Sequence, residues 1–122
     1  MAATANILIQ GSIIGNLGGT RVIGPINLSS AAANGQVQQI VLQSGANTIT
    51  VPSTPAPSGC VIVLPATNTA VTTLKGVSGD TGIAIGKTTT TVLNWDATAV
   101  PASFVLNSAA TQTALITEIT FF

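Results

Sequence analysis

Residues that could perform acid–base or nucleophilic chemistry are few in this chain of 122 residues. There is no histidine or tyrosine, and charged residues make up 5% of the sequence, against about 25% in an ordinary globular domain. Catalysis near neutral pH usually draws on His, Asp, Glu, Lys, Tyr or Cys. The composition therefore predicts a protein that is not an enzyme. The charged residues are Arg21, Lys75, Asp80, Lys87, Asp96 and Glu118.

The three carboxylates would form a site only if folding brought them together. A glycosidase needs two carboxylates about 5–10 Å apart, and a calcium site needs several clustered oxygen ligands. Asp80, Asp96 and Glu118 are isolated in the sequence. We expect Asp80, within segment 78–82, to stabilise a turn instead. A small glycoside-acting enzyme stays open as an alternative, but the sequence predicts no catalytic residues, no metal, no cofactor and no small-molecule substrate.

Two further motifs have a structural interpretation. Cys60 begins an apolar run, and the chain has no histidine to activate its thiol, so we expect a core residue. The Gly-Lys-Thr at 86–88 resembles the end of a phosphate-binding loop. That loop needs four residues between its glycines, whereas three separate Gly82 from Gly86, and no helical pattern follows. We expect a strand-to-turn junction there.

The formal net charge is zero, which bounds the possible partners. Three cations cannot neutralise the roughly six or more phosphates of a tight duplex complex, so we expect no nucleic acid. Apolar runs such as 61–64 are far shorter than the roughly 20 residues of a membrane-spanning helix, and residues 1–6 lack the basic start of a secretory signal. Zero net charge also weakens repulsion between copies, which favours an assembly.

The elements that position these residues are expected to be strands. Val, Ile and Thr dominate, and their branched β-carbons suit a pleated sheet. Turn residues recur about every eight to twelve positions, as in sandwiches and barrels. The fold class is therefore predicted as all-β, an antiparallel β-sandwich, in which Gly24-Pro25 marks an edge or a bulge. The predicted strands are 7–9, 20–28, 37–43, 47–51, 60–64, 70–75, 82–85, 90–95, 103–107 and 113–122.

Residues 1–19 differ from the rest because apolar residues alternate there with frequent glycines. Such a segment is either an arm that becomes ordered on a neighbour or an irregular first strand, and both interpretations stay open. Residues 20–122 are expected to form a single β-sandwich domain. The apolar residues of the segment are Ile7, Leu8, Ile9, Ile13, Ile14 and Leu17.

The C-terminal half carries a resemblance. The segment TLKGVSGDTGIAI at 73–85, followed by SFVLN at 103–107 and EITFF at 118–122, resembles small virion proteins of tailed bacteriophages, including capsid decoration (cement) proteins. The resemblance covers roughly residues 60–122. It implies a jelly-roll-like sandwich, assembly as a homotrimer, the major capsid protein as partner, and a place on the capsid surface of a virion after synthesis in the host cytoplasm.

Composition and resemblance together predict a cement protein that stabilises a phage head by protein–protein contacts. The alternative is a phage tail or baseplate module that binds host-surface glycans, with the single Trp95 as its aromatic platform. The candidate interface residues are Ile7, Ile9, Ile13, Ile14, Leu17, Arg21, Trp95, Phe121 and Phe122.

Overall fold

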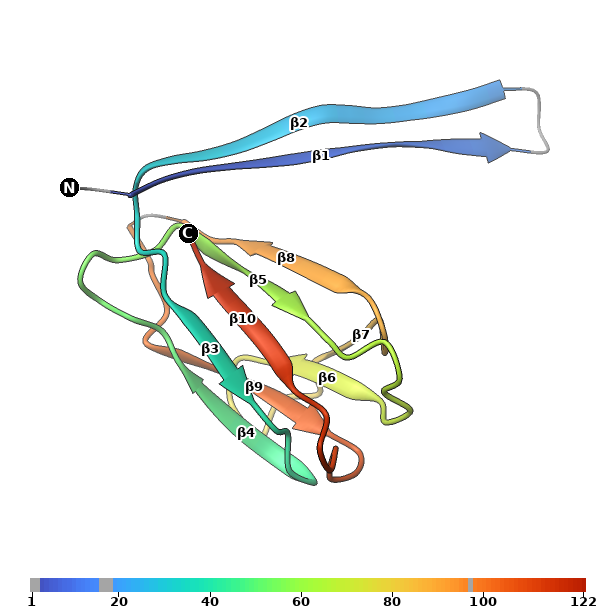
Figure 1. Ribbon diagram of the computed structural model, residues 1–122, viewed down its shortest axis with the longest axis vertical. Coiled ribbons are helices and arrows are strands. Elements are labelled where there is room, and N and C mark those ends of the chain that lie inside the picture. Colours follow the sequence, from blue (N-terminus) through green and yellow to red (C-terminus); the bar gives the residue numbers. More distant parts are fainter. Residues whose placement is uncertain (1–2, 16–18, 97) are drawn as a thin grey trace.

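The computed structural model of the chain describes residues 3–15, 19–96 and 98–122. Within these ranges all regular structure is β-strand, and every pair of neighbouring strands is antiparallel. This confirms the predicted all-β class. The strands form one two-stranded sheet and two four-stranded sheets (Figure 1).

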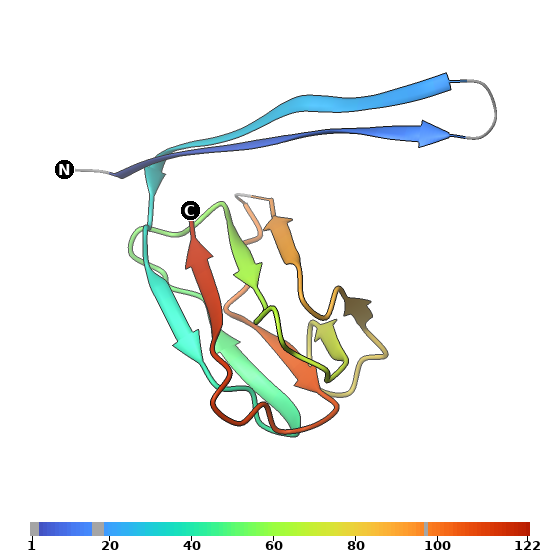
Figure 2. The ribbon, with the colours of Figure 1, turned by 45° about the vertical axis from the view of Figure 1, so that its right-hand side comes forward.

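The two-stranded sheet is a long hairpin, hereafter the arm. Strand β1 (Ala3–Gly15) pairs antiparallel with β2 (Gly19–Ala33) along its whole length. Figures 1 and 2 show the arm extending past the remaining strands, with its far end away from them. The pairing places residues 20–33 in the arm, although the sequence alone assigns them to the sandwich domain.

The other eight strands form what we call the two-sheet unit, residues 34–122. One sheet has the strand order β3-β10-β5-β8, and the other has the order β4-β9-β6-β7. The strands of the first sheet are β3 (Val37–Ile40), β10 (Thr117–Phe121), β5 (Gly59–Val63) and β8 (Thr90–Asn94). Those of the second are β4 (Gly45–Thr50), β9 (Ser103–Ser108), β6 (Thr72–Lys75) and β7 (Ile83–Ile85).

A hydrophobic cluster of described residues joins the two sheets. Alternate residues of β10 are buried, as the period of two in a strand requires, and they meet residues of β4 and β9 from the other sheet. Cys60 is fully buried in this cluster, which confirms the prediction of a core cysteine, and burial raises the pKa of its thiol to about 12. The cluster consists of Leu42, Ile49, Val51, Cys60, Ile62, Leu64, Phe104, Leu106, Ile119 and Phe121.

Side-chain amides hold two of the loops to the sheets. The buried Asn47 donates from Nδ2 to the carbonyl oxygens of Leu106 at 3.0 Å and Gln43 at 2.9 Å, and it accepts from the Gln43 amide at 2.9 Å. The buried Asn68 donates to the carbonyl oxygen of Lys87 at 2.7 Å. Because a buried amide is costly without partners, each network holds its loop in one conformation.

Two isoleucines near the C-terminus give a matched test of this core. Ile119 is fully buried, so we expect Ile119→Ala to lower the free energy of unfolding by about 2–5 kcal/mol. Ile116 is 54% exposed, so we expect Ile116→Ala to change it by no more than about 0.5 kcal/mol. Urea denaturation followed by circular dichroism measures both values. Equal losses would contradict the position of Ile119 between the sheets.

Candidate functional site

The strand register of the arm gives it one apolar face. Residues directly opposite each other on antiparallel strands point to the same side of the sheet, and alternate residues along a strand share a side. Ile7 lies opposite Leu28, and Ile9 lies opposite Ile26. The apolar face therefore contains Ala5, Ile7, Ile9, Ile13, Ile23, Ile26 and Leu28, with Arg21 opposite Ile13.

A β-bulge makes this face continuous. Ile9 pairs with Ile26, whereas Gly11 pairs with Ile23, so β2 uses one residue more than β1 between these two pairs. The extra residue lies at Gly24-Pro25 and shifts the alternation of β2 by one position. Without this shift Ile23 would point to the opposite side from Ile26. The interruption predicted at Gly24-Pro25 is thus a bulge, and it keeps the apolar residues of both strands on one side.

The opposite face of the arm is mostly polar. It carries hydroxyl and amide side chains interspersed with three aliphatic ones. Ile14 belongs to this face, because it is adjacent to Ile13 in β1 and alternate residues point to opposite sides. The face contains Asn6, Leu8, Gln10, Ser12, Ile14, Thr20, Val22, Asn27 and Ser29.

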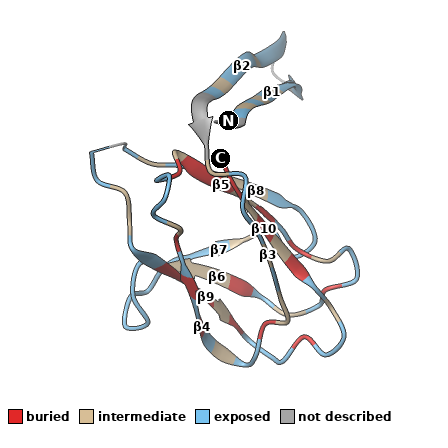
Figure 3. Ribbon diagram, turned by 60° about the vertical axis from the view of Figure 1, so that its left-hand side comes forward, coloured by how far each residue is buried: buried red, intermediate tan, exposed pale blue. Residues whose placement is uncertain are grey.

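The apolar face is less exposed at the base of the arm than in its outer half. Near the base, Ile7, Ile9 and Leu28 are half-buried, and Ala5 and Ile7 line a cavity of about 490 Å³ together with residues of the two-sheet unit. Farther out, Ile26 is 45% and Ile13 is 55% exposed. Figure 3 shows the outer part of the arm mostly in the colour of exposed residues. The chain itself therefore covers the base of this face but leaves the outer half open.

The predicted interface residues fall into three groups. Ile7, Ile9 and Ile13 lie on the apolar face with Arg21, whereas Ile14 lies on the polar face. Leu17 lies outside the described residues. The remaining three candidates, Trp95, Phe121 and Phe122, lie in the two-sheet unit.

Sequence reasoning missed the half of the apolar face that β2 provides, namely Ile23, Ile26 and Leu28. Two apolar segments of similar length on either side of a Gly-Gly pair at 18–19 were a possible hairpin signal. The bulge obscures the signal, because Ile23 and Ile26 share a face although they are three residues apart.

The two phenylalanines at the C-terminus are buried by their own chain. Phe121 is fully buried in the core cluster, and Phe122 is buried beside it. Their amides and carbonyls are also engaged, since the Phe122 amide donates to the Gly59 carbonyl at 3.0 Å and the Phe121 amide to the Gln36 carbonyl at 2.9 Å. Both rings line the cavity beneath the base of the arm.

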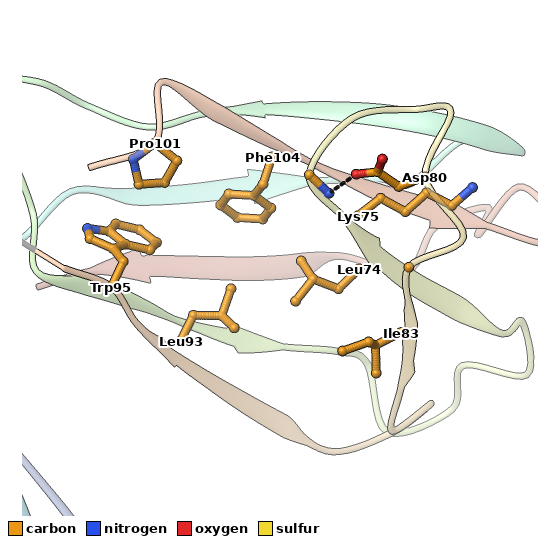
Figure 4. A pocket seen from close by; sticks show the side chains of 10 residues that line it. Leu74, Lys75, Asp80, Ile83, Leu93, Trp95, Pro101 and Phe104 are labelled. Carbon is orange, nitrogen blue, oxygen red and sulfur yellow. Dashed lines mark hydrogen bonds between the residues drawn. The ribbon is translucent and has the colours of Figure 1, made fainter. Parts of the chain in front are cut away.

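An apolar pocket of about 550 Å³ opens where β6 and β7 of one sheet face β8 of the other. Trp95 and Pro101 lie at one end, and Lys75, Asp80 and Ile83 lie at the other (Figure 4). Between them the lining is aliphatic and aromatic, formed by Leu74, Leu93 and Phe104. Trp95 is half-buried, and its indole Nε1 donates to the Pro57 carbonyl at 2.7 Å.

The polar end of the apolar pocket is a turn held by Asp80. Oδ2 of this carboxylate accepts hydrogen bonds from the backbone amides of Gly76 at 3.1 Å and Val77 at 2.9 Å. The Asp80 amide in turn donates to the Val77 carbonyl at 3.1 Å. The turn role predicted for Asp80 is thus present, with its carboxylate bonded to amides that precede it. Lys75 Nζ donates to the Ser78 carbonyl of the same turn at 3.4 Å.

Each of the other two carboxylates has a hydrogen-bond partner outside the apolar pocket. Asp96 Oδ1 accepts from the hydroxyl of Thr98 at 2.6 Å and from its amide at 2.7 Å, and these bonds lower the pKa of Asp96. Glu118 Oε2 accepts from Gln39 Nε2 at 3.2 Å. The apolar pocket contains Asp80 alone among the three carboxylates. Paired carboxylates of the glycosidase type are therefore not part of this pocket.

Besides the apolar face of the arm and the apolar pocket, a metal site, a membrane-spanning helix or similar proteins would point to a function. Within 3–15, 19–96 and 98–122, no three His, Cys, Asp or Glu side chains are grouped so that they could hold a metal ion. No helix in the same part of the chain is long and apolar enough to cross a membrane. No family model, no curated protein and no solved structure matches this chain.

Two glycines beside the bulge give a matched test of the apolar face. Gly24 has a φ of +77°, and a Cβ added there would collide with the carbonyl oxygen of Ile9. We expect Gly24→Ala to destabilise the hairpin by at least about 1–2 kcal/mol, because L-residues disfavour positive φ. A Cβ at Gly11 meets no atom within 4 Å, so Gly11→Ala should leave the strand pairing intact.

Cross-strand nuclear Overhauser contacts between Ile9 and Ile26, measured by NMR, report on this pairing. They should weaken in the Gly24→Ala variant and persist in the Gly11→Ala variant. Unchanged contacts in both variants would show that the bulge does not require a glycine.

Proposed function

We propose that this chain is a structural protein of a phage virion, and that it decorates and stabilises the capsid by protein–protein contacts. The observation that carries the proposal is the apolar outer face of the arm, which the chain does not cover itself. A virion shell supplies neighbouring subunits that can cover such a face. Binding of this kind needs apolar area and complementary shape, and it needs no catalytic group.

The strand pairing supports a jelly roll for the two-sheet unit. When a ribbon of eight strands folds over on itself, the first strand pairs with the last, the second with the seventh, and so on inward. This chain pairs β3 with β10, β4 with β9, β5 with β8 and β6 with β7. The additional pairs β10–β5 and β9–β6 join these ribbons into two sheets. Jelly rolls of eight strands occur in viral capsid proteins and in lectins.

The composition supports a surface that is covered in an assembly. Interface cores are depleted in Lys, Glu and Asp, and charged residues make up 5% of this chain. Several aliphatic side chains of the two-sheet unit are also exposed, among them Val77 and Ile83. Together with the zero net charge, these side chains favour a homo-oligomer, and a trimer is the form that the resemblance to phage decoration proteins implies.

The glycan-binding alternative has weaker support. A sugar platform needs an aromatic face open to solvent, whereas Trp95 is half-buried at one end of the apolar pocket and its indole nitrogen is bonded to Pro57. Between its two ends the apolar pocket is lined by aliphatic and aromatic side chains, which offer few hydrogen-bond partners for sugar hydroxyls. We therefore place the function in assembly rather than in recognition of host glycans.

Adjacent residues on opposite faces of the arm test the proposal. Ile23 lies on the apolar face and Val22 on the polar face. We expect Ile23→Asp to reduce binding to capsids by about tenfold or more, because burial of a β-branched apolar side chain is replaced by burial of a charge. Val22→Asp should bind about as well as the unmodified chain. Cosedimentation with purified capsids that lack the protein measures both.

Electron cryo-microscopy of the same particles gives the location. Density for the chain on the outer surface of the head is the expected result. Density only at the tail, or none in purified particles, would contradict the cement function, and equal binding by the two variants would contradict the role of the apolar face.

A further inference from the structure

We propose, resting on the assembly function above, that the far end of the arm of one copy docks into the apolar pocket of a second copy. Ile13 would enter the apolar part of the pocket, and the guanidinium of Arg21 would bind the carboxylate of Asp80. The contact joins two different surfaces, the arm of one copy and the pocket of another.

The far end of the arm presents an apolar and a cationic side chain together. Ile13 and Arg21 are directly opposite each other in the register of β1 and β2, so both point from the apolar face. Opposed Cβ atoms in an antiparallel pair are about 4.5–5.5 Å apart. A ligand site for this end must therefore offer an apolar surface with a negative group beside it.

The apolar pocket offers that combination. Asp80 and Ile83 lie at the same end of it as Lys75, next to the aliphatic and aromatic lining (Figure 4). The Lys75 ammonium donates to the Ser78 carbonyl of the turn at 3.4 Å. Both hydrogen bonds that hold the Asp80 turn reach Oδ2, which leaves Oδ1 of the same carboxylate for a further donor. An arginine is suited to such an oxygen because its planar guanidinium has several donors and keeps its charge.

Charge distribution favours contact between arm and pocket over contact between two arms. Arg21 is the sole charged residue of the sequence from 1 to 33, so the arm has a charge of +1. Residues 34–122 carry two lysines and three carboxylates, a net charge of −1. Two arms therefore repel each other, whereas an arm and the two-sheet unit of a neighbour attract each other.

The direction of the arm makes the contact intermolecular. Its far end extends away from the two-sheet unit in both Figure 1 and Figure 2, whereas the pocket is formed by β6 to β9 within that unit. A second copy therefore supplies the arm. Because the two surfaces differ, repeated contacts of this type close into a ring when the rotation allows it, and a ring of three is the trimer proposed above.

Single cysteines test the contact directly, because the native Cys60 is fully buried and its thiol has a pKa of about 12. One chain carries Ile13→Cys, and a second chain, with a different affinity tag, carries Ile83→Cys. We expect a disulfide-linked heterodimer when the two full-length chains are mixed and oxidised. Ile14→Cys is the matched control, since it is the next residue along and lies on the polar face; it should give at least about tenfold less product.

A charge variant tests the proposed ion pair in the same assay. Arg21→Glu in the arm chain should reduce the heterodimer yield several-fold. Lys87→Glu in that chain makes the same change in net charge at a residue that does not line the pocket, and it should leave the yield unchanged. Equal yields for Ile13→Cys and Ile14→Cys, or no product from either, would overturn the docking.

The two proposals fail in different ways. If Ile13→Cys gives no product while capsid binding still depends on Ile23, the docking is wrong and the virion function stands. If the specific disulfide forms but the chain is absent from purified particles, the docking stands and the virion function is wrong.

Discussion

A two-stranded sheet is marginally stable in water unless something covers one of its faces. Strands β1 and β2 form such a sheet, and the bulge at Gly24-Pro25 aligns the isoleucines of both strands on one side. The base of this face lies over the two-sheet unit, but the outer half, with Ile13 and Ile26, is open. The proposed assembly, the docking surface and the role of the bulge all follow from the need to bury this face.

The loops of the two-sheet unit are held in place with few charged side chains. Asn47 and Asn68 each bind several backbone groups and so hold their loops without an ion pair. Asp80 does the same at the turn beside the apolar pocket. Because so few charged side chains are needed, most of the surface is uncharged. An uncharged surface can be buried against a neighbour at a lower desolvation cost than a charged one.

Sequence reasoning succeeded where the signal is local. The Val, Ile and Thr content predicts strands, and the apolar run that begins at Cys60 predicts a core residue. Cys60 is fully buried in β5, which lies between β10 and β8. Prolines lack the amide donor that a central strand needs, and the proline-rich segment 52–57 accordingly connects β4 to β5 without being a strand.

It failed where the signal depends on pairing. The bulge breaks the period of two in β2, so Ile23 and Ile26 did not appear as one face, and the pairing of β1 with β2 was not predicted. The apolar pocket combines residues of four strands and their loops, from Leu74 to Phe104, and no local pattern marks such a combination. The first feature requires the register of two paired strands, and the second requires the packing of strands that are distant in the sequence.

Amide hydrogen exchange at increasing protein concentration tests most directly whether the arm depends on a neighbour. In dilute solution we expect the amides of β1 and β2 to exchange rapidly, while those of β5 and β10 are protected, because the central strands are buried and the arm is not. As copies associate, protection should rise in the arm and at β6 and β7 beside the pocket. Arm amides that are already as protected in the dilute monomer as those of β5 would contradict this account.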